Sequence, residues 1–286
     1  MKYRVGAVQY KLEDITSFDQ FAHQVEHYVR CASEFGVQML LFPEFMTTQL
    51  LSIPDDEGNP QPFDNLPNYT EEYIELFQSL SKKYDVHIIG GTHIVKMSDG
   101  SLRNGAHYFS PKGDVKVQHK VHLTPTEVNE WGMSAGDGVE VFDTPFGKIA
   151  MLTCYDIEFP EIVRMVRAKG ADVIYCPSCT DDQHGFYRVR YCCHARTVEN
   201  QVYVVTTGTV GTLRNVDFMR ANVGKAAILA PNDIPFPPAG VIAEGIMNDD
   251  MIIVGDIDLS LLQDVRAKGA VMTWRDRRTD LYTDWS

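Results

Sequence analysis

The stretch Ile149-Ala-Met-Leu-Thr-Cys154-Tyr-Asp-Ile-Glu-Phe-Pro-Glu161 joins two different local patterns at a cysteine. The apolar run 149–152 has the length of a buried strand, and the acidic residues and proline in 156–161 are typical of a helix first turn. Apolar residues continue at helical spacing until Gly170, a helix-ending residue. The pattern predicts that Cys154 lies on a sharp strand-to-helix turn, where the helix N-terminus lowers the thiol pKa and favours a nucleophile. The alternative is a small buried hydrophobic residue, as most cysteines are.

Two further segments end in residues that complement a thiol. The apolar run 39–42 is followed by Pro43 and Glu44, and the alternating run 115–119 is followed by Lys120. Strand ends gather at one edge of an α/β sheet, where sites form. A thiol, a carboxylate and an ammonium group together suit acyl transfer, because they supply a nucleophile, a proton carrier and a cation for a developing oxyanion.

These segments resemble the motifs of a known superfamily. Phe42-Pro43-Glu44-Phe45, His119-Lys120-Val121-His122-Leu123 and Leu152-Thr-Cys154-Tyr-Asp156 look like the glutamate, lysine and cysteine motifs of the nitrilase (carbon–nitrogen hydrolase) superfamily. Residues 195–201 and 277–282 are also similar to that superfamily, so the likeness covers nearly the whole chain in order. Residues 177–181 and 209–212 further resemble a bacterial subgroup that is often fused to an acetyltransferase domain, which this sequence lacks.

The resemblance implies an α/β fold, a four-layer α-β-β-α sandwich with mixed sheets that usually pairs into a dimer. It implies that Glu44 is the general base, that Cys154 is the nucleophile and that Lys120 stabilises the oxyanion together with the backbone N–H of Tyr155. No metal and no cofactor are expected.

Many superfamily members have a second glutamate between the lysine and the cysteine. Glu127 and Glu130 are both candidates. Glu130 is preferred as the catalytic one, because it precedes Trp131 and stands six residues before Gly136, close to the acid–aromatic–glycine run of the superfamily. Glu127 remains a candidate for substrate binding.

The expected reaction is thiol-dependent hydrolysis of a non-peptide carbon–nitrogen bond, in an amide or an N-carbamoyl compound. Tyr155-Asp156 after the cysteine looks like amidases, whereas nitrilases more often carry tryptophan and glutamate there. A nitrilase is therefore one alternative. A catalytically silent regulatory protein of the same fold is the other, since a fold hosts many functions.

Glu158 bears on the charge of the substrate. Omega-amidases and D-carbamoylases, which bind a substrate carboxylate, place an arginine four residues after the nucleophile, where this sequence has Glu158. A carboxylate there predicts neutral or cationic amides, unless Arg188 or Arg190 binds an acid. The alternative role of Glu158 is to interact with the helix dipole. Cys179 and Thr180 are further candidates for substrate binding.

Composition limits the partners. A net charge of −13 and a pI of about 5.1 argue against nucleic acid and anionic membranes, and the expected partners are a small molecule, water and a second copy of the chain. No long apolar run and no signal peptide pattern appear, which predicts a cytoplasmic protein. The six cysteines are expected to be reduced. Cys176, Cys179, Cys192, Cys193 and His194 could be combined into a zinc site only against the helical pattern of 187–199.

The chain is expected to form one domain, 1–286. Its tail, from about residue 270, carries Trp274, Tyr282 and Trp285. Aromatic residues in a terminal segment predict that it docks, either on the parent domain or at a dimer interface.

Overall fold

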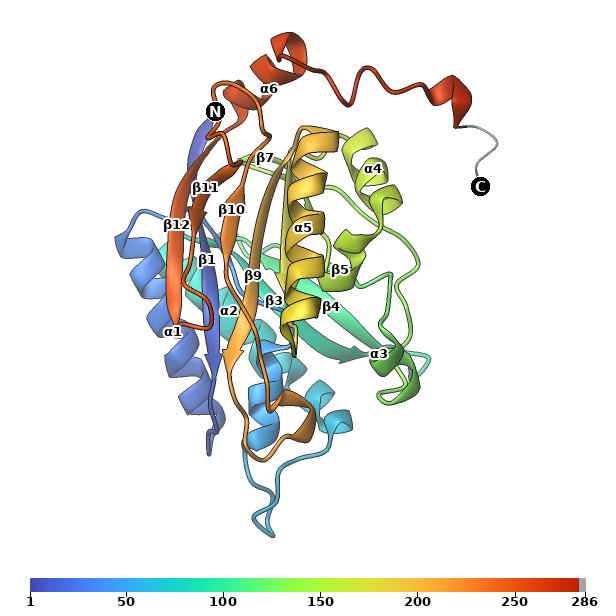
Figure 1. Ribbon diagram of the computed structural model, residues 1–286. Helices are drawn as coiled ribbons and strands as arrows, with labels where there is room; N and C mark the ends of the chain where they lie inside the picture. Colours follow the sequence, from blue (N-terminus) through green and yellow to red (C-terminus); the bar gives the residue numbers. More distant parts are fainter. Residues whose placement is uncertain (283–286) are drawn as a thin grey trace.

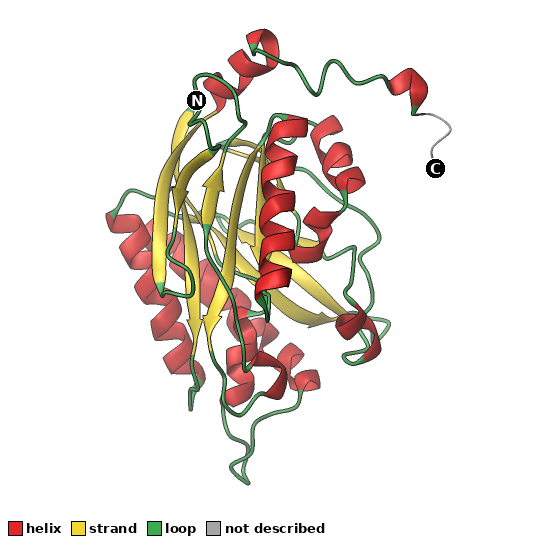
Figure 2. Cartoon of the chain, in the orientation of Figure 1, coloured by secondary structure: helices red, strands yellow, loops and turns green. Residues whose placement is uncertain are grey.

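The computed structural model describes residues 1–282 and shows the expected four layers (Figures 1 and 2). The helices are α1 (Phe18–Glu34), α2 (Thr70–Tyr84), α3 (Pro125–Asn129), α4 (Pro160–Ala168), α5 (Gln183–Asn200) and α6 (Leu259–Lys268). The strands are β1 (Lys2–Leu12), β2 (Met39–Leu41), β3 (His87–Lys96), β4 (Leu102–Phe109), β5 (Val115–His119), β6 (Phe142–Thr144), β7 (Gly147–Met151), β8 (Val173–Ser178), β9 (Tyr203–Gly211), β10 (Ala227–Leu229), β11 (Val241–Glu244) and β12 (Met251–Asp258).

The strands follow one hydrogen-bonded path in the order β5-β4-β3-β2-β1-β9-β8-β7-β6, with β12 added to β1 and β10 to β9. Strand β1 joins the two halves, because residues 5–7 pair with β2 and residues 10–12 pair with β9. Both parallel and antiparallel pairs occur, so the sheets are mixed as expected.

Alternation along the strands builds three apolar layers. One cluster lies between α1, α2 and the half that contains β2 and β3, and another lies between α4, α5 and the half that contains β7 and β8. The third cluster combines residues from both halves, such as Val5 and Ala7 of β1 with Val173 and Tyr175 of β8. Because successive side chains of a strand face opposite sides, β1 also sends Val8 and Tyr10 into the helix-side cluster. The two halves therefore pack face to face between outer helices.

The turn after β7 differs from the prediction. Cys154 has a φ of 47° and opens a 3₁₀ turn, η3 (Cys154–Glu158), and the α-helix begins only at Pro160. Asp156 accepts the backbone N–H of Thr153 at 3.2 Å at the start of this turn, and Pro160 occupies the first turn of the α-helix, where proline is favoured. The thiol is thus on a sharp turn, but it is not at the N-terminus of an α-helix.

Two of the connections between strands contain short helices. The proline-rich segment after Glu44 holds two 3₁₀ helices, η1 (Met46–Ser52) and η2 (Phe63–Tyr69). The segment after Lys120 holds α3, which begins with a capping box between Thr124 and Glu127. Two shorter 3₁₀ turns complete the described elements, η4 (Asp217–Met219) and η5 (Thr279–Leu281).

The tail contacts the parent domain around Trp274, whereas Leu281 and Tyr282 are exposed. The guanidinium groups of Arg277, Arg167 and Arg164 lie 3.4, 4.8 and 5.8 Å from the ring centre of Trp274, and the last two belong to α4. Trp285 lies outside the described residues. Among residues 1–282, no helix combines the length and the apolar character that crossing a membrane requires.

Candidate active site

Three chain segments from different parts of the sheet bring Glu44, Lys120 and Cys154 to one cavity. Glu44 follows β2, Lys120 follows β5, and Cys154 follows β7. All three residues are buried, with exposed fractions of 1%, 2% and 6% for the whole residue. The structure therefore brings together the three residues that the motifs predicted.

The backbone around Glu44 needs a glycine on the neighbouring strand. Gly91 of β3 has a φ of 71°, and a Cβ there would lie 2.0 Å from the carbonyl oxygen of Pro43. The next residue, Thr92, accepts the backbone N–H of Phe45 on its hydroxyl at 3.0 Å. Only glycine allows this close approach, and the approach fixes the direction in which Glu44 leaves the sheet.

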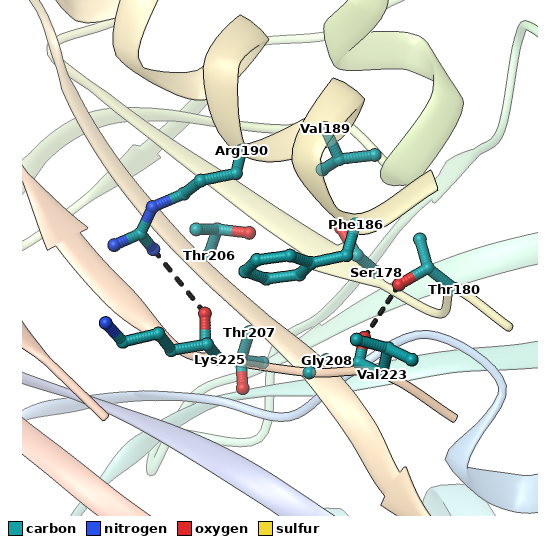
Figure 3. Close-up of a pocket in the computed structure, with 11 residues that line it drawn as sticks. Ser178, Thr180, Phe186, Val189, Arg190, Thr206, Thr207, Gly208, Val223 and Lys225 are labelled. Atoms are coloured by element: carbon teal, nitrogen blue, oxygen red, sulfur yellow. Dashed lines mark hydrogen bonds between the residues drawn. The ribbon is translucent and has the colours of Figure 1, made fainter. Parts of the chain in front are cut away.

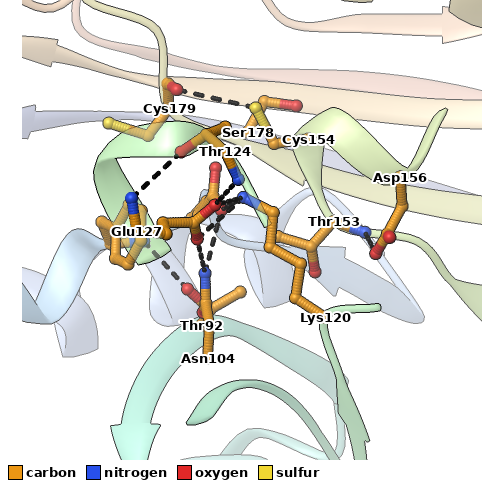
Figure 4. A network of polar contacts seen from close by, with 12 residues as sticks. Thr92, Asn104, Lys120, Thr124, Glu127, Thr153, Cys154, Asp156, Ser178 and Cys179 are labelled. Carbon is orange, nitrogen blue, oxygen red and sulfur yellow. Dashed lines mark hydrogen bonds and ion pairs between the residues drawn. The ribbon is translucent and has the colours of Figure 1, made fainter. Parts of the chain in front are cut away.

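Lys120 lies between two carboxylates (Figure 4). Its Nζ donates to Glu44 Oε1 at 2.8 Å and to the two oxygens of Glu127 at 2.9 and 2.8 Å. Breaking such a buried ion pair by removing one partner is costly, because the remaining charge stays buried without compensation. The ammonium group is therefore held in one place relative to Cys154.

The structure reverses the preference between the two candidate glutamates. Glu127 is 1% exposed and its Oε2 also accepts the backbone N–H of Thr124 at 2.8 Å, whereas Glu130 is exposed at the cavity rim. Glu127 is the third residue of α3 and belongs to its capping box, whereas Glu130 is the residue at which α3 ends. Glu127 is thus the second glutamate of the buried network.

Asn104 of β4 belongs to the same network, although no sequence pattern pointed to it. Its side-chain amide donates to Glu44 Oε1 at 3.0 Å and to Glu127 Oε1 at 3.2 Å. Two buried acceptors, Glu44 Oε2 and Asn104 Oδ1, have no hydrogen-bond partner within the described structure. Buried polar atoms are rarely left unpaired, so these acceptors are candidates for contact with a ligand or with water.

Asp156 ties the segment that carries Lys120 to the turn that carries Cys154. Its Oδ1 accepts the backbone N–H groups of Val121 and His122 at 3.2 and 2.8 Å and lies 3.0 Å from Nδ1 of His122. In the sequence this residue is predicted as an acid in the first turn of a helix and as part of the cysteine motif. In the structure it connects the segment after Lys120 with the turn that carries Cys154.

Burial and the neighbouring charges favour the protonated form of the Cys154 thiol. Burial and the charge of Glu44 raise the pKa of Cys154 well above its ordinary value, against the opposing effect of Lys120. Burial raises the pKa of Glu44 to about 7, and Lys120 limits that increase. Burial alone would lower the pKa of Lys120, but Glu44 and Glu127 raise it well above its ordinary value. These effects favour the protonated thiol over the thiolate expected from a helix N-terminus, so a proton leaves Cys154 during attack.

The cavity has a volume of about 790 Å³. The predicted binding residues Tyr155, Glu158, Cys179 and Thr180 all line it, as does Glu130. The backbone carbonyl of Cys179 accepts from Cys154 Sγ at 3.6 Å, which makes it a hydrogen-bond acceptor directly beside the thiol. Phe45, Trp131 and Phe218 supply an aromatic part of the lining.

The other cysteines are free thiols. Cys176 and Cys193 are buried, Cys192 is half-buried on α5, and Cys179 Sγ accepts from the hydroxyl of Thr209 at 3.1 Å. Within residues 1–282, no three His, Cys, Asp or Glu side chains gather closely enough to hold a metal ion.

Several known proteins have sequences similar to this chain. The chain is 45% identical to the probable hydrolase YhcX of Bacillus subtilis over 279 residues, which are 98% of this chain and 54% of that protein. It therefore spans about half the length of that relative. It is 26% identical to omega-amidase NIT2 of Xenopus tropicalis over 294 residues, 99% of this chain and 97% of the relative. It is also 29% identical to a nitrilase of Pyrococcus abyssi over 267 residues, 92% and 93% of the two chains.

Solved structures share the fold. A carbon-nitrogen hydrolase from Helicobacter pylori superposes with a TM-score of 0.82 at 20% identity, over 99% of this chain and 97% of the other. An amidase from Nesterenkonia sp. superposes with a TM-score of 0.75 at 18% identity, over 99% and 96%. A mutant of that amidase shows covalent addition of the acetamide moiety of fluoroacetamide at its active site cysteine.

The family comparison agrees with the three motifs and the architecture. Residues 4–267 match the sequence profile of the family described as carbon-nitrogen hydrolase. That range contains both halves of the sandwich and every residue of the buried network. The chain therefore belongs to the carbon-nitrogen hydrolase family.

Proposed function

We propose that this protein hydrolyses small non-peptide amides or N-carbamoyl compounds through an acyl-enzyme on Cys154. The observation that carries the proposal is the buried position of Glu44 and Lys120, joined at 2.8 Å, in the same cavity as the Cys154 thiol. A nucleophile, a proton acceptor and a fixed cation are the three groups that acyl transfer requires.

In the first step the Cys154 proton passes to Glu44 while the sulfur attacks the carbonyl carbon. The free oxygen Oε2 of Glu44 is the natural acceptor, because Oε1 is already occupied by Lys120 and Asn104. The C–S bond forms and the carbonyl π electrons move to oxygen. Lys120 and the backbone N–H of Tyr155 stabilise that oxyanion.

In the second step the tetrahedral intermediate collapses. Glu44 returns the proton to the leaving nitrogen, the C–N bond breaks, and ammonia or an amine departs from a thioester on Cys154. Water then attacks the thioester with Glu44 as the base, and the acid product and the thiol are released. Glu127 and Asn104 keep Glu44 and Lys120 in position during both halves of the reaction.

One contact favours amides over nitriles. The Cys179 carbonyl lies next to the nucleophile and is a hydrogen-bond acceptor. An amide N–H can donate to it, whereas a nitrile nitrogen carries no hydrogen. The omega-amidase relatives support the same choice. A nitrilase remains the second candidate, because the Pyrococcus abyssi relative bears that name.

The test is ammonia release from matched amides, N-carbamoyl amines and nitriles. The account predicts turnover of an amide or a carbamoyl compound, and loss of that turnover in Cys154→Ala, while Cys179→Ala retains a measurable rate. Faster release from nitriles would favour the nitrilase. A complete absence of turnover, with no selective alkylation of Cys154, would favour the silent regulatory protein.

We also propose that the chain acts as a homodimer in the cytoplasm. Tyr187 and Tyr191 on α5 are 41% and 65% exposed, and their rings stack with centres 5.6 Å apart. Exposed aromatic residues are enriched where partners bind. Light scattering at micromolar concentration should give twice the chain mass, and Tyr191→Glu should give the monomer mass. A monomer for the unmodified chain would contradict this proposal.

A further inference from the structure

The cavity above Cys154 combines aromatic rings with acidic side chains. The ring centre of Trp131 lies 5.3 Å from that of Phe45 and 5.0 Å from that of Phe218, and all three residues line the cavity. Glu130, Glu158 and Asp181 line it as well. Aromatic faces and carboxylates both attract cations, so this lining suits a ligand with a positively charged end.

Of the two arginines that could have bound an acid, only Arg188 lines the cavity. Arg190 lies on another face of α5, where it donates to the carbonyl of Lys225 at 3.4 Å (Figure 3). It also donates to Glu244 at 2.7 Å. The space beside Arg190 measures only about 20 Å³, which is room for about one water molecule. The charge of Arg190 is therefore engaged away from Cys154.

Glu158 is held by its backbone in a fixed position. Buried Arg196 donates from Nη2 to the carbonyl of Glu158 and from Nε to that of Ile157, both at 2.9 Å. The Glu158 side chain is 17% exposed, so most of its carboxylate lies inside the rim. A carboxylate carried on a fixed backbone loses less entropy when it binds a ligand than one on a mobile segment.

The partner of Glu158 is easily replaced. Arg188 Nε lies 3.5 Å from Glu158 Oε2, and the Arg188 side chain is 62% exposed. Ion pairs of such length and exposure contribute little to stability. A cationic group of a ligand can therefore take the place of Arg188 at small cost. An anionic group that approached Arg188 would instead meet Glu158 at the same point.

We infer that the substrate carries a positively charged end, such as an ammonium group, which Glu158 binds beside the aromatic lining. This inference rests on the proposed function, because it assigns the same cavity to substrate. It makes Glu158 the residue that selects for charge, and it makes Arg188 a counterion that moves aside when the substrate enters.

The experiment compares pentanamide, its omega-amino derivative and glutaric acid monoamide, which differ only at the far end. We expect the omega-amino compound to have the highest kcat/KM. Glu158→Gln should reduce its advantage over pentanamide about 10- to 100-fold, as expected for loss of a charge-assisted hydrogen bond. Arg188→Gln should leave that advantage in place. Glu161→Gln is the matched control, because Glu161 is an exposed acid on the next turn outside the cavity lining, and it should not alter the ratio.

Binding of the same three compounds to Cys154→Ala, measured by calorimetry, separates the two proposals. If nothing is hydrolysed by the unmodified protein, the proposed reaction fails, but tighter binding of the omega-amino compound that Glu158→Gln removes would still support the charge selection. Equal binding of all three compounds would overturn the inference. So would preferred binding of the monoamide that Arg188→Gln abolishes.

Discussion

The ion pairs at the floor of the cavity and at its rim are built in opposite ways. At the floor, Lys120 contacts Glu44 and Glu127 at 2.8 Å, and each of the three side chains is 1% exposed. At the rim, Arg188 and Glu158 are 3.5 Å apart and the arginine is mostly exposed. A buried group without its partner is strongly destabilising, whereas an exposed pair contributes little. The floor is therefore suited to hold charges still for chemistry, and the rim is suited to exchange one cation for another.

Removing the cation from each pair should show the largest contrast. Lys120→Met leaves two buried carboxylates without compensation and should lower the free energy of unfolding by about 3–5 kcal/mol. It should also reduce kcat by about 10²–10³-fold through loss of oxyanion stabilisation. Urea unfolding and steady-state kinetics measure both effects.

Arg188→Gln is the matched control at the rim and should change the free energy of unfolding by no more than about 0.5 kcal/mol. If the two substitutions proved equally mild, the floor would not be the rigid network that its distances indicate.

The two glutamates of the segment after Lys120 give the next contrast. Glu127→Gln removes one charge from the floor and weakens the fixation of Lys120, so kcat should fall by about 10- to 100-fold, as for loss of outer positioning partners elsewhere. Glu130→Gln changes only the rim and should alter kcat less than about threefold, which is the scale of a weak surface interaction. A larger effect at Glu130 would restore the order that the sequence spacing suggested.

The pH dependence of kcat/KM should be set by Glu44 at the cavity floor and not by Glu158 at the rim. Glu44 must be ionised to accept the Cys154 proton, and its pKa is raised to about 7 by burial. The value of kcat/KM should therefore fall about tenfold per pH unit below that pKa, with Glu44 and Cys154 titrating as a coupled pair. Glu158→Gln should leave this acid limb in place. A limb near the ordinary glutamate pKa of about 4.3 would contradict the burial effect.

The raised pKa of Glu44 also determines how its contribution to the free energy of unfolding changes with pH. Between about pH 4.3 and 7 the folded protein retains a proton that the unfolded chain has released. That contribution is complete below the unfolded pKa and is lost as pH rises through about 7. The difference in urea midpoint between the unmodified protein and Glu44→Gln, followed across this range, measures it. A difference that did not depend on pH would contradict the raised pKa.

The sequence predicted the residues that come directly after strands, and missed those that support them. Glu44, Lys120 and Cys154 stand at strand ends, so the period-two pattern and the motifs together located them. Asn104 lies inside β4, where an asparagine has no distinguishing neighbour pattern, and only the pairing of strands reveals that it reaches Glu44. Such long-range contacts depend on topology and not on local spacing.

Glu127 could have been preferred to Glu130. Thr124 and Glu127 stand three residues apart in a capping box, and that pattern predicts a first-turn glutamate whose carboxylate is held by the backbone. The order acid–aromatic at Glu130-Trp131 was followed instead. The thiol pKa was also predicted in the wrong direction, because the α-helix begins at Pro160 and burial dominates at Cys154. In both cases the backbone geometry of a few residues explains why the structure differs from the prediction.

The most direct test of the central claim is the mass of the Glu44→Gln protein after reaction with fluoroacetamide. Loss of the Glu44 charge removes one cause of the raised thiol pKa and leaves Lys120, which favours the thiolate. The account predicts displacement of fluoride by Cys154 Sγ, one acetamide moiety per chain located on Cys154 by peptide mapping, and no adduct in Glu44→Gln/Cys154→Ala. Equal labelling of all six cysteines, or an adduct on Cys179 with Cys154 unmodified, would contradict it.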